Sequence, residues 1–71
     1  MAVYRQLALC TRLRRMRIET QRTQKQVAAY MGISQAAYSR LEKGEIELTV
    51  QKLFILSELY SVPVDKIISG I

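Results

Sequence analysis

The residues best suited to chemistry in this chain lie in one short segment, residues 35–43, which divides into two faces at helical spacing. On a helix of 3.6 residues per turn, one face carries short polar and basic side chains: Gln35, Ala36, Ser39, Lys43 and, at its edge, Arg40. The opposite face is formed by Ala37, Tyr38 and Leu41. Glutamine pairs with the adenine edge, arginine with O6 and N7 of guanine, and an alanine methyl contacts thymine. The polar face is therefore suited to contacting base edges in a major groove.

An ordinary solvated helix face is the alternative interpretation of this pattern. Three flanking features favour the first interpretation. Gly32 tolerates the left-handed conformation of a sharp turn, Ser34 is a good helix N-cap, and the preceding helix opens with Gln24 and Lys25. Two short helices joined by a glycine-containing turn form the helix-turn-helix pattern, which covers about residues 23–44.

Five helices are expected to position this segment. Their approximate bounds are 3–18, 23–32, 35–43, 49–60 and 63–68, where 23, 32 and 49 are capping or terminating residues. Thr23 with Gln26 forms a capping box, Thr49 caps the fourth helix, and Pro63 suits the start of the fifth. No segment alternates with a period of two, so the sequence predicts an all-α fold in a single domain, residues 1–71.

The composition excludes most enzyme chemistry. The 71 residues include one cysteine, Cys10, and no histidine. A single cysteine forms no internal disulfide and favours a reducing compartment, so a cytoplasmic location is expected. Without histidine there is no His–Cys zinc site and no imidazole base, and the lone thiol has no base beside it. We expect no catalysis, metal, cofactor or small-molecule ligand, and no membrane contact, because no apolar run is long enough to span a bilayer.

The charge of the chain is polarised. Residues 1–43 hold nine Lys and Arg against two Glu, a net charge of +7, whereas residues 44–71 hold two Lys against four acidic residues, a net charge of −2. A polyanion is therefore expected to bind the N-terminal part.

The segment Thr23–Gly44, TQKQVAAYMGISQAAYSRLEKG, resembles the helix-turn-helix of Cro and Xre-type repressors. That family includes phage repressors, restriction–modification controller proteins and many antitoxins. The segment VPVDKI at residues 62–67 is similar to the closing helix of the same family. The resemblance spans about residues 9–68 and implies a compact, lambda-repressor-like domain of five helices.

The resemblance also implies roles for individual residues. The base-contacting positions are Gln35, Ala36, Ser39 and Arg40. We expect phosphate contacts from residues near the two helix starts and the end of the recognition helix: Arg22, Thr23, Gln24, Lys25, Ser34 and Lys43. Arg17 and Glu42 match a pair that forms a buried structural salt bridge in this family.

The chain departs from the family pattern at two places. Tyr38 stands where an aliphatic residue is commoner, and we expect its ring to fill the core while its hydroxyl reaches water or a phosphate. After Gly44, where basic residues often grip the DNA backbone, this chain has Glu45 and Glu47. Because carboxylates repel phosphates, this loop is expected to lie away from DNA or to meet a partner subunit.

The C-terminal region, residues 50–71, has more apolar residues than one small core can bury. The residues expected at a dimer interface are Phe54, Ile55, Leu59, Tyr60, Ile68 and Ile71. Scattered exposed hydrophobic residues are the alternative. A two-fold dimer would place its recognition helices about one DNA turn apart, ~34 Å, on a palindromic operator.

The function that the sequence favours is a DNA-binding transcriptional regulator, such as a repressor or controller protein, encoded by a bacterium or phage and associated with the nucleoid when bound. The alternative is an antitoxin or adaptor whose main ligand is a protein and whose DNA binding is secondary or lost. The acidic loop and the apolar C-terminal helices favour that alternative.

Overall fold

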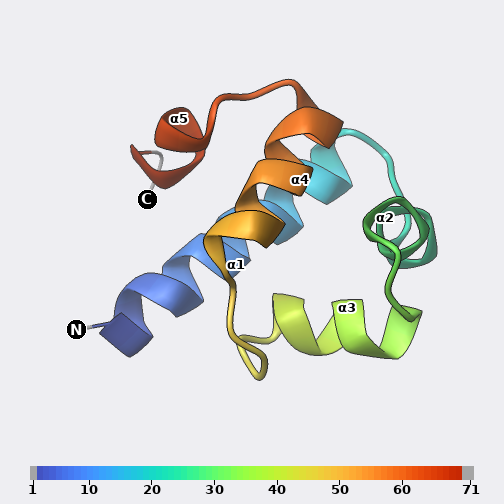
Figure 1. Cartoon of the computed structure of the whole chain (residues 1–71), viewed down its shortest axis with the longest axis horizontal. Coiled ribbons are helices and arrows are strands. Elements are labelled where there is room, and N and C mark those ends of the chain that lie inside the picture. Colours follow the sequence, from blue (N-terminus) through green and yellow to red (C-terminus); the bar gives the residue numbers. More distant parts are fainter. Residues whose placement is uncertain (1, 70–71) are drawn as a thin grey trace.

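The computed structural model describes residues 2–69, with side chains from residue 6 onward. It contains the helices α1 (Ala2–Glu19), α2 (Gln24–Met31), α3 (Gln35–Glu42), α4 (Val50–Tyr60) and α5 (Val64–Ser69) (Figure 1). Residues 2–69 include no strand, and the predicted all-α fold with five helices is confirmed. The predicted helix 35–43 is one residue shorter in the structure, because Lys43 is its C-cap.

Three of the helices begin at hydroxyl-bearing residues. The hydroxyl of Thr23 accepts a hydrogen bond from the Gln26 backbone at 3.0 Å, and Ser34 and Thr49 cap α3 and α4 in the same way. The Gln26 side chain also accepts from the Thr23 backbone N–H at 2.8 Å, which completes the predicted capping box. These local bonds satisfy backbone donors that a helix start leaves free, and so they fix where α2, α3 and α4 begin.

One type of turn ends each of the helices α1 to α4. A residue with positive φ follows the helix, and these residues are Gln21 (58°), Gly32 (73°), Gly44 (76°) and Ser61 (56°). The N–H of each of these residues bonds the carbonyl three residues back, and the next N–H bonds the carbonyl five residues back. This is the Schellman motif, which satisfies the free carbonyl groups at a helix end. The predicted helix stops at Gly32 and Gly44 are confirmed.

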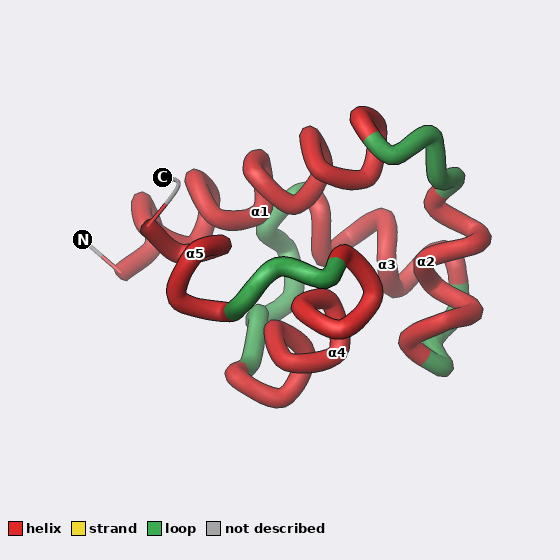
Figure 2. Tube along the Cα trace, turned by 90° about the horizontal axis from the view of Figure 1, so that it is seen from above, coloured by secondary structure: helices red, strands yellow, loops and turns green. Residues whose placement is uncertain are grey.

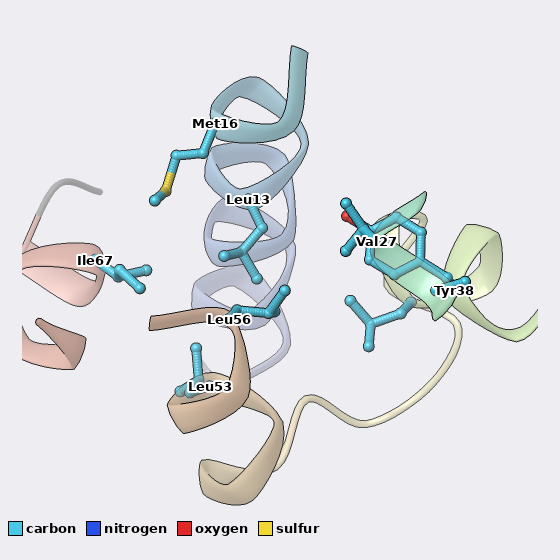
Figure 3. Packing of buried hydrophobic residues seen from close by; sticks show 9 residues of the cluster. Leu13, Met16, Val27, Tyr38, Leu53, Leu56 and Ile67 are labelled. Atoms are coloured by element: carbon cyan, nitrogen blue, oxygen red, sulfur yellow. The ribbon is translucent and has the colours of Figure 1, made fainter. Parts of the chain in front are cut away.

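Every helix contributes to one small core. Its fully buried members are Leu13, Val27, Tyr38, Leu41, Leu56 and Ile67 (Figure 3). α1 contacts α3 and α5, and α4 contacts α2 and α5. Seen from above, α1 and α4 lie on opposite sides, with α5 beside the first half of α1 (Figure 2). The Arg12 Nε donates to the Ile67 carbonyl at 3.1 Å and ties α1 to α5.

Candidate nucleic-acid interface

The two faces of α3 differ as the helical spacing predicts. Gln35, Ala36 and Arg40 are exposed and Ser39 is half-buried, whereas Tyr38 and Leu41 on the other side are fully buried. α3 lies along one edge of the molecule, the lower edge in Figure 1, and α5 lies on the upper side. The only acidic residue of α3, Glu42, is buried, so the outer face of this helix carries no carboxylate.

The residues expected to bind phosphates lie around the starts of α2 and α3 and the end of α3. Thr23, Lys25, Ser34 and Lys43 are exposed, and Arg22 and Gln24 are half-buried. The capping hydroxyls of Thr23 and Ser34 accept hydrogen bonds from the backbone, which leaves each hydroxyl hydrogen available to a phosphate oxygen. Helix N-termini also carry a partial positive charge that favours anions.

The structure brings Arg17 and Glu42 together in a buried ion pair. Nε of Arg17 donates to Oε2 of Glu42 at 2.6 Å and Nη2 to Oε1 at 3.3 Å, so the contact is bidentate. The side chains are 13% and 3% exposed. Nη1 of Arg17 donates to the Arg22 carbonyl at 2.9 Å, and the pair therefore joins α1, the loop before α2, and α3.

Gln24 takes part in the same network, a contact that the sequence interpretation missed. Its Nε2 donates to Oε1 of Glu42 at 3.1 Å and leaves the second amide hydrogen available to a phosphate. Burial alone would raise the pKa of the Glu42 carboxyl, but the hydrogen bonds from Arg17 and Gln24 outweigh it and hold that pKa below 4.5. The hydrogen bond to Glu42 in turn raises the pKa of Arg17. Glu42 is therefore charged at neutral pH, and its carboxylate is bound by Arg17 and Gln24 of the same chain.

The prediction for Tyr38 is half right. Its ring fills the core, but its hydroxyl is buried near Glu42, and no partner among residues 6–69 meets hydrogen-bond geometry. The hydroxyl therefore does not reach water or a phosphate, because α3 presents this side chain to α1 and α2 instead of to the surface. Burial raises the pKa of the Tyr38 hydroxyl far above its ordinary value.

Arg22 is held over an aromatic ring at the end of α4. Its guanidinium carbon lies 5.4 Å from the ring centre of Tyr60, a distance at which a cation and a ring attract each other. The Tyr60 ring packs against the core, its hydroxyl is buried, and burial raises its pKa. Tyr60, which was expected at a dimer interface, therefore supports a basic side chain of its own domain.

The acidic residue Glu45 lies beside the recognition segment. Its Oε1 is 3.6 Å from Nε of Arg40, and both side chains are more than half exposed. From the sequence, this loop is expected to lie away from DNA or to meet a partner subunit, and the pair with Arg40 is not among the expectations. The signal was available in the spacing, because a helix that ends at Gly44 in a Schellman motif brings residues 40 and 45 together.

The residues expected at a dimer interface are unequal in exposure. Phe54 is 58% exposed and Ile68 39%, Ile55 is half-buried, and Leu59 packs against the core as Tyr60 does. Ile71 lies outside the described residues. No helix of the described part is both long and apolar enough to cross a bilayer. Within that same part, no group of three or more His, Cys, Asp or Glu residues could hold a metal ion.

An exposed basic and polar helix, positioned by a capped helix and a glycine turn, defines a helix-turn-helix domain. A family model described as Helix-turn-helix matches residues 13–67, and the chain belongs to this Cro/C1-type family. Its five helices fit the lambda-repressor-like form of the fold. The match supports a DNA-binding regulator of a family that is typically non-enzymatic. No curated protein and no solved structure matches the chain.

Proposed function

We propose that this protein is a sequence-specific transcriptional regulator that binds double-stranded DNA by placing α3 in the major groove. The observation that carries the proposal is the outer face of α3, where Gln35 and Arg40 are exposed while the acidic Glu42 is buried. Gln35, Ala36, Ser39 and Arg40 would contact base edges. Such a regulator works by occupying an operator, and no covalent chemistry is part of the proposal.

Phosphate contacts would orient α3 in the groove. Arg22, Thr23, Gln24, Lys25, Ser34 and Lys43 supply the donors and positive charges. The contact with Tyr60 supports this role for Arg22, because a guanidinium already held over a ring loses less conformational entropy on binding. A DNA-binding regulator of this kind would act in the cytoplasm, at the nucleoid.

We propose further that the regulator is a homodimer on a palindromic operator. Phe54 and Ile68, together with Val50, expose apolar surface on α4 and α5, two helices that contact each other. Ile55, Ile71 and the exposed parts of Leu59 and Tyr60 would complete the interface. A single charge in such an apolar contact is costly to bury. Phe54→Glu and Ile55→Glu are therefore each expected to halve the mass in sedimentation and to weaken operator binding. An unchanged mass in both variants would contradict this interface.

Selection of binding sites from random duplexes, followed by a salt titration of the selected site, tests the proposed function. We expect a palindromic site with half-sites about one turn apart, and an affinity that falls by orders of magnitude between low and moderate salt as counterions are released. Failure to bind any duplex at low salt would contradict the proposal. That outcome would instead favour a protein-binding antitoxin or adaptor, for which the exposed Glu45, Glu47 and Phe54 would supply the surface.

A further inference from the structure

The residue that follows the left-handed position of a Schellman motif usually makes an apolar contact back onto its helix. Ile33 after α2 and Val62 after α4 follow this rule and pack against the core, whereas Arg22 after α1 is basic and lies over the Tyr60 ring. Glu45, at the same position after α3, is instead exposed and forms an ion pair with Arg40. At the end of α3, an ion pair thus stands where an apolar contact is usual. The partner of Glu45 in this pair is Arg40, a residue proposed to contact bases.

The backbone of Glu45 is held firmly beside α3. Its N–H bonds the Arg40 carbonyl at 2.9 Å, and the N–H of Gly44 bonds the Leu41 carbonyl at 3.1 Å. Gly44 has a φ of 76°, and a Cβ added there would lie 2.5 Å from Cδ2 of Leu7 in α1. The Leu7 side chain therefore lies against this turn, and the two backbone hydrogen bonds fix the backbone of Glu45 relative to that of Arg40.

The contact between the two side chains involves Nε of Arg40 and leaves its terminal nitrogens, Nη1 and Nη2, available to a ligand. The guanidinium atom nearest the carboxylate is Nε, and the terminal nitrogens donate no hydrogen bond within the part of the chain that the structure describes. Those two nitrogens are the donors that pair end-on with O6 and N7 of guanine. Arg40 can therefore meet a guanine while Glu45 stays beside Nε.

We infer that Glu45 is a specificity-determining residue, which orients Arg40 toward guanine and opposes its contact with phosphate. This inference rests on the proposed DNA-binding function. The acceptor edge of guanine carries only partial negative charges and repels the carboxylate weakly, whereas a phosphate that approached Arg40 would bring a full negative charge close to that of Glu45. The carboxylate thus lowers binding to unrelated sequences more than binding to a site with guanine at this position.

Glu45→Gln and Glu47→Gln form a matched pair of variants for the test. Each removes one negative charge from the same exposed loop, but the Glu47 carboxylate forms no ion pair with the side chains of residues 6–69. The affinities of the full chain for the selected duplex and for a random duplex of equal length are measured at one salt concentration. We expect Glu45→Gln to lower the ratio of specific to random affinity by about two- to fivefold, the range that an exposed ion pair supports. Glu47→Gln should raise both affinities alike and leave the ratio unchanged.

Equal effects of the two variants on the ratio would overturn the inference and leave the proposed function intact. A second test repeats Glu45→Gln in an Arg40→Ala background, where the ratio should no longer respond to position 45. A persisting effect there would show that Glu45 acts without Arg40 and would also overturn the inference. If the unaltered chain bound neither duplex at low salt, the proposed function itself would fail, and the inference with it.

Discussion

Helix α3 takes part in two arginine–glutamate pairs that share their chemistry and differ in surroundings. Arg17 and Glu42 meet at 2.6 Å with side chains 13% and 3% exposed, and Gln24 donates to the same carboxylate. Arg40 and Glu45 meet at 3.6 Å with side chains 63% and 54% exposed. The first pair lies between α1 and α3, and the second lies on the surface where the polar face of α3 ends.

The difference in burial gives the two pairs different roles: the buried pair stabilises the fold, and the exposed pair is available for binding. A buried pair loses its hydration, so removal of one partner leaves an uncompensated charge and is costly. An exposed pair keeps most of its hydration and stabilises a fold by about 0–1 kcal/mol. The exposed Arg40 of the second pair is therefore available to contact a ligand, whereas the buried Arg17 of the first is not.

The largest expected effect comes from breaking the buried pair. Glu42→Ala leaves the Arg17 guanidinium buried without a counter-charge and is expected to lower the free energy of unfolding by about 3–5 kcal/mol. For a chain of 71 residues this is a large part of the total stability. Urea unfolding followed by circular dichroism measures the change.

The exposed pair supplies the control for that measurement. Glu45→Ala should change the free energy of unfolding by no more than about 0.5 kcal/mol, as most surface substitutions do. Similar losses in Glu42→Ala and Glu45→Ala would contradict the distinction between the two pairs.

A smaller effect is expected in acid. The pKa of Glu42 is lower in the folded chain than its ordinary value of 4.5. The pair therefore stabilises the fold above pH 4.5, and this stabilisation is lost as the pH falls through the folded pKa. The free energy of unfolding, measured from pH 7 down to pH 3, should decrease in the acid part of this range, and the decrease should be shallower in Glu42→Gln. An identical acid slope in the two proteins would show that other carboxyl groups carry the dependence.

The exposed pair should matter for binding and not for folding. Arg40→Ala is expected to leave the unfolding curve almost unchanged and to cost about 1–3 kcal/mol of affinity for the selected site. It should also relax the preference at one base position. Fluorescence anisotropy with the selected duplex and its single-base variants checks both effects. An equal loss of affinity for random DNA would show that Arg40 contacts only phosphates and does not distinguish bases.

The features predictable from the sequence depend on residues close together in the chain. The caps at Thr23, Ser34 and Thr49 need only an oxygen three residues before a free N–H, and the helix ends at Gly32 and Gly44 need only a residue that tolerates positive φ. The division of α3 into two faces follows from its period. These local rules were enough to predict the start and the end of both α2 and α3, the two helices of the helix-turn-helix.

The contacts that could not be predicted depend on packing between helices or on side-chain rotamers. The pair of Arg17 and Glu42 spans 25 residues and was expected only because the sequence resembles a family. The bond from Arg12 to the Ile67 carbonyl spans 55 residues, and no pattern in the sequence indicates it. The prediction that the Tyr38 hydroxyl reaches water or a phosphate was wrong, because periodicity shows which face a residue occupies but not how deeply its side chain is buried.

A titration of ¹⁵N-labelled protein with a selected duplex, followed by amide NMR, tests the DNA-binding role of α3 most directly. If α3 enters the major groove, the largest shifts occur at residues 22–25 and 34–45, where the starts of α2 and α3, the polar face of α3 and its terminal turn lie. Large shifts confined to residues 50–69, with the amides of α3 unchanged, would contradict the claim that α3 is the DNA-binding helix.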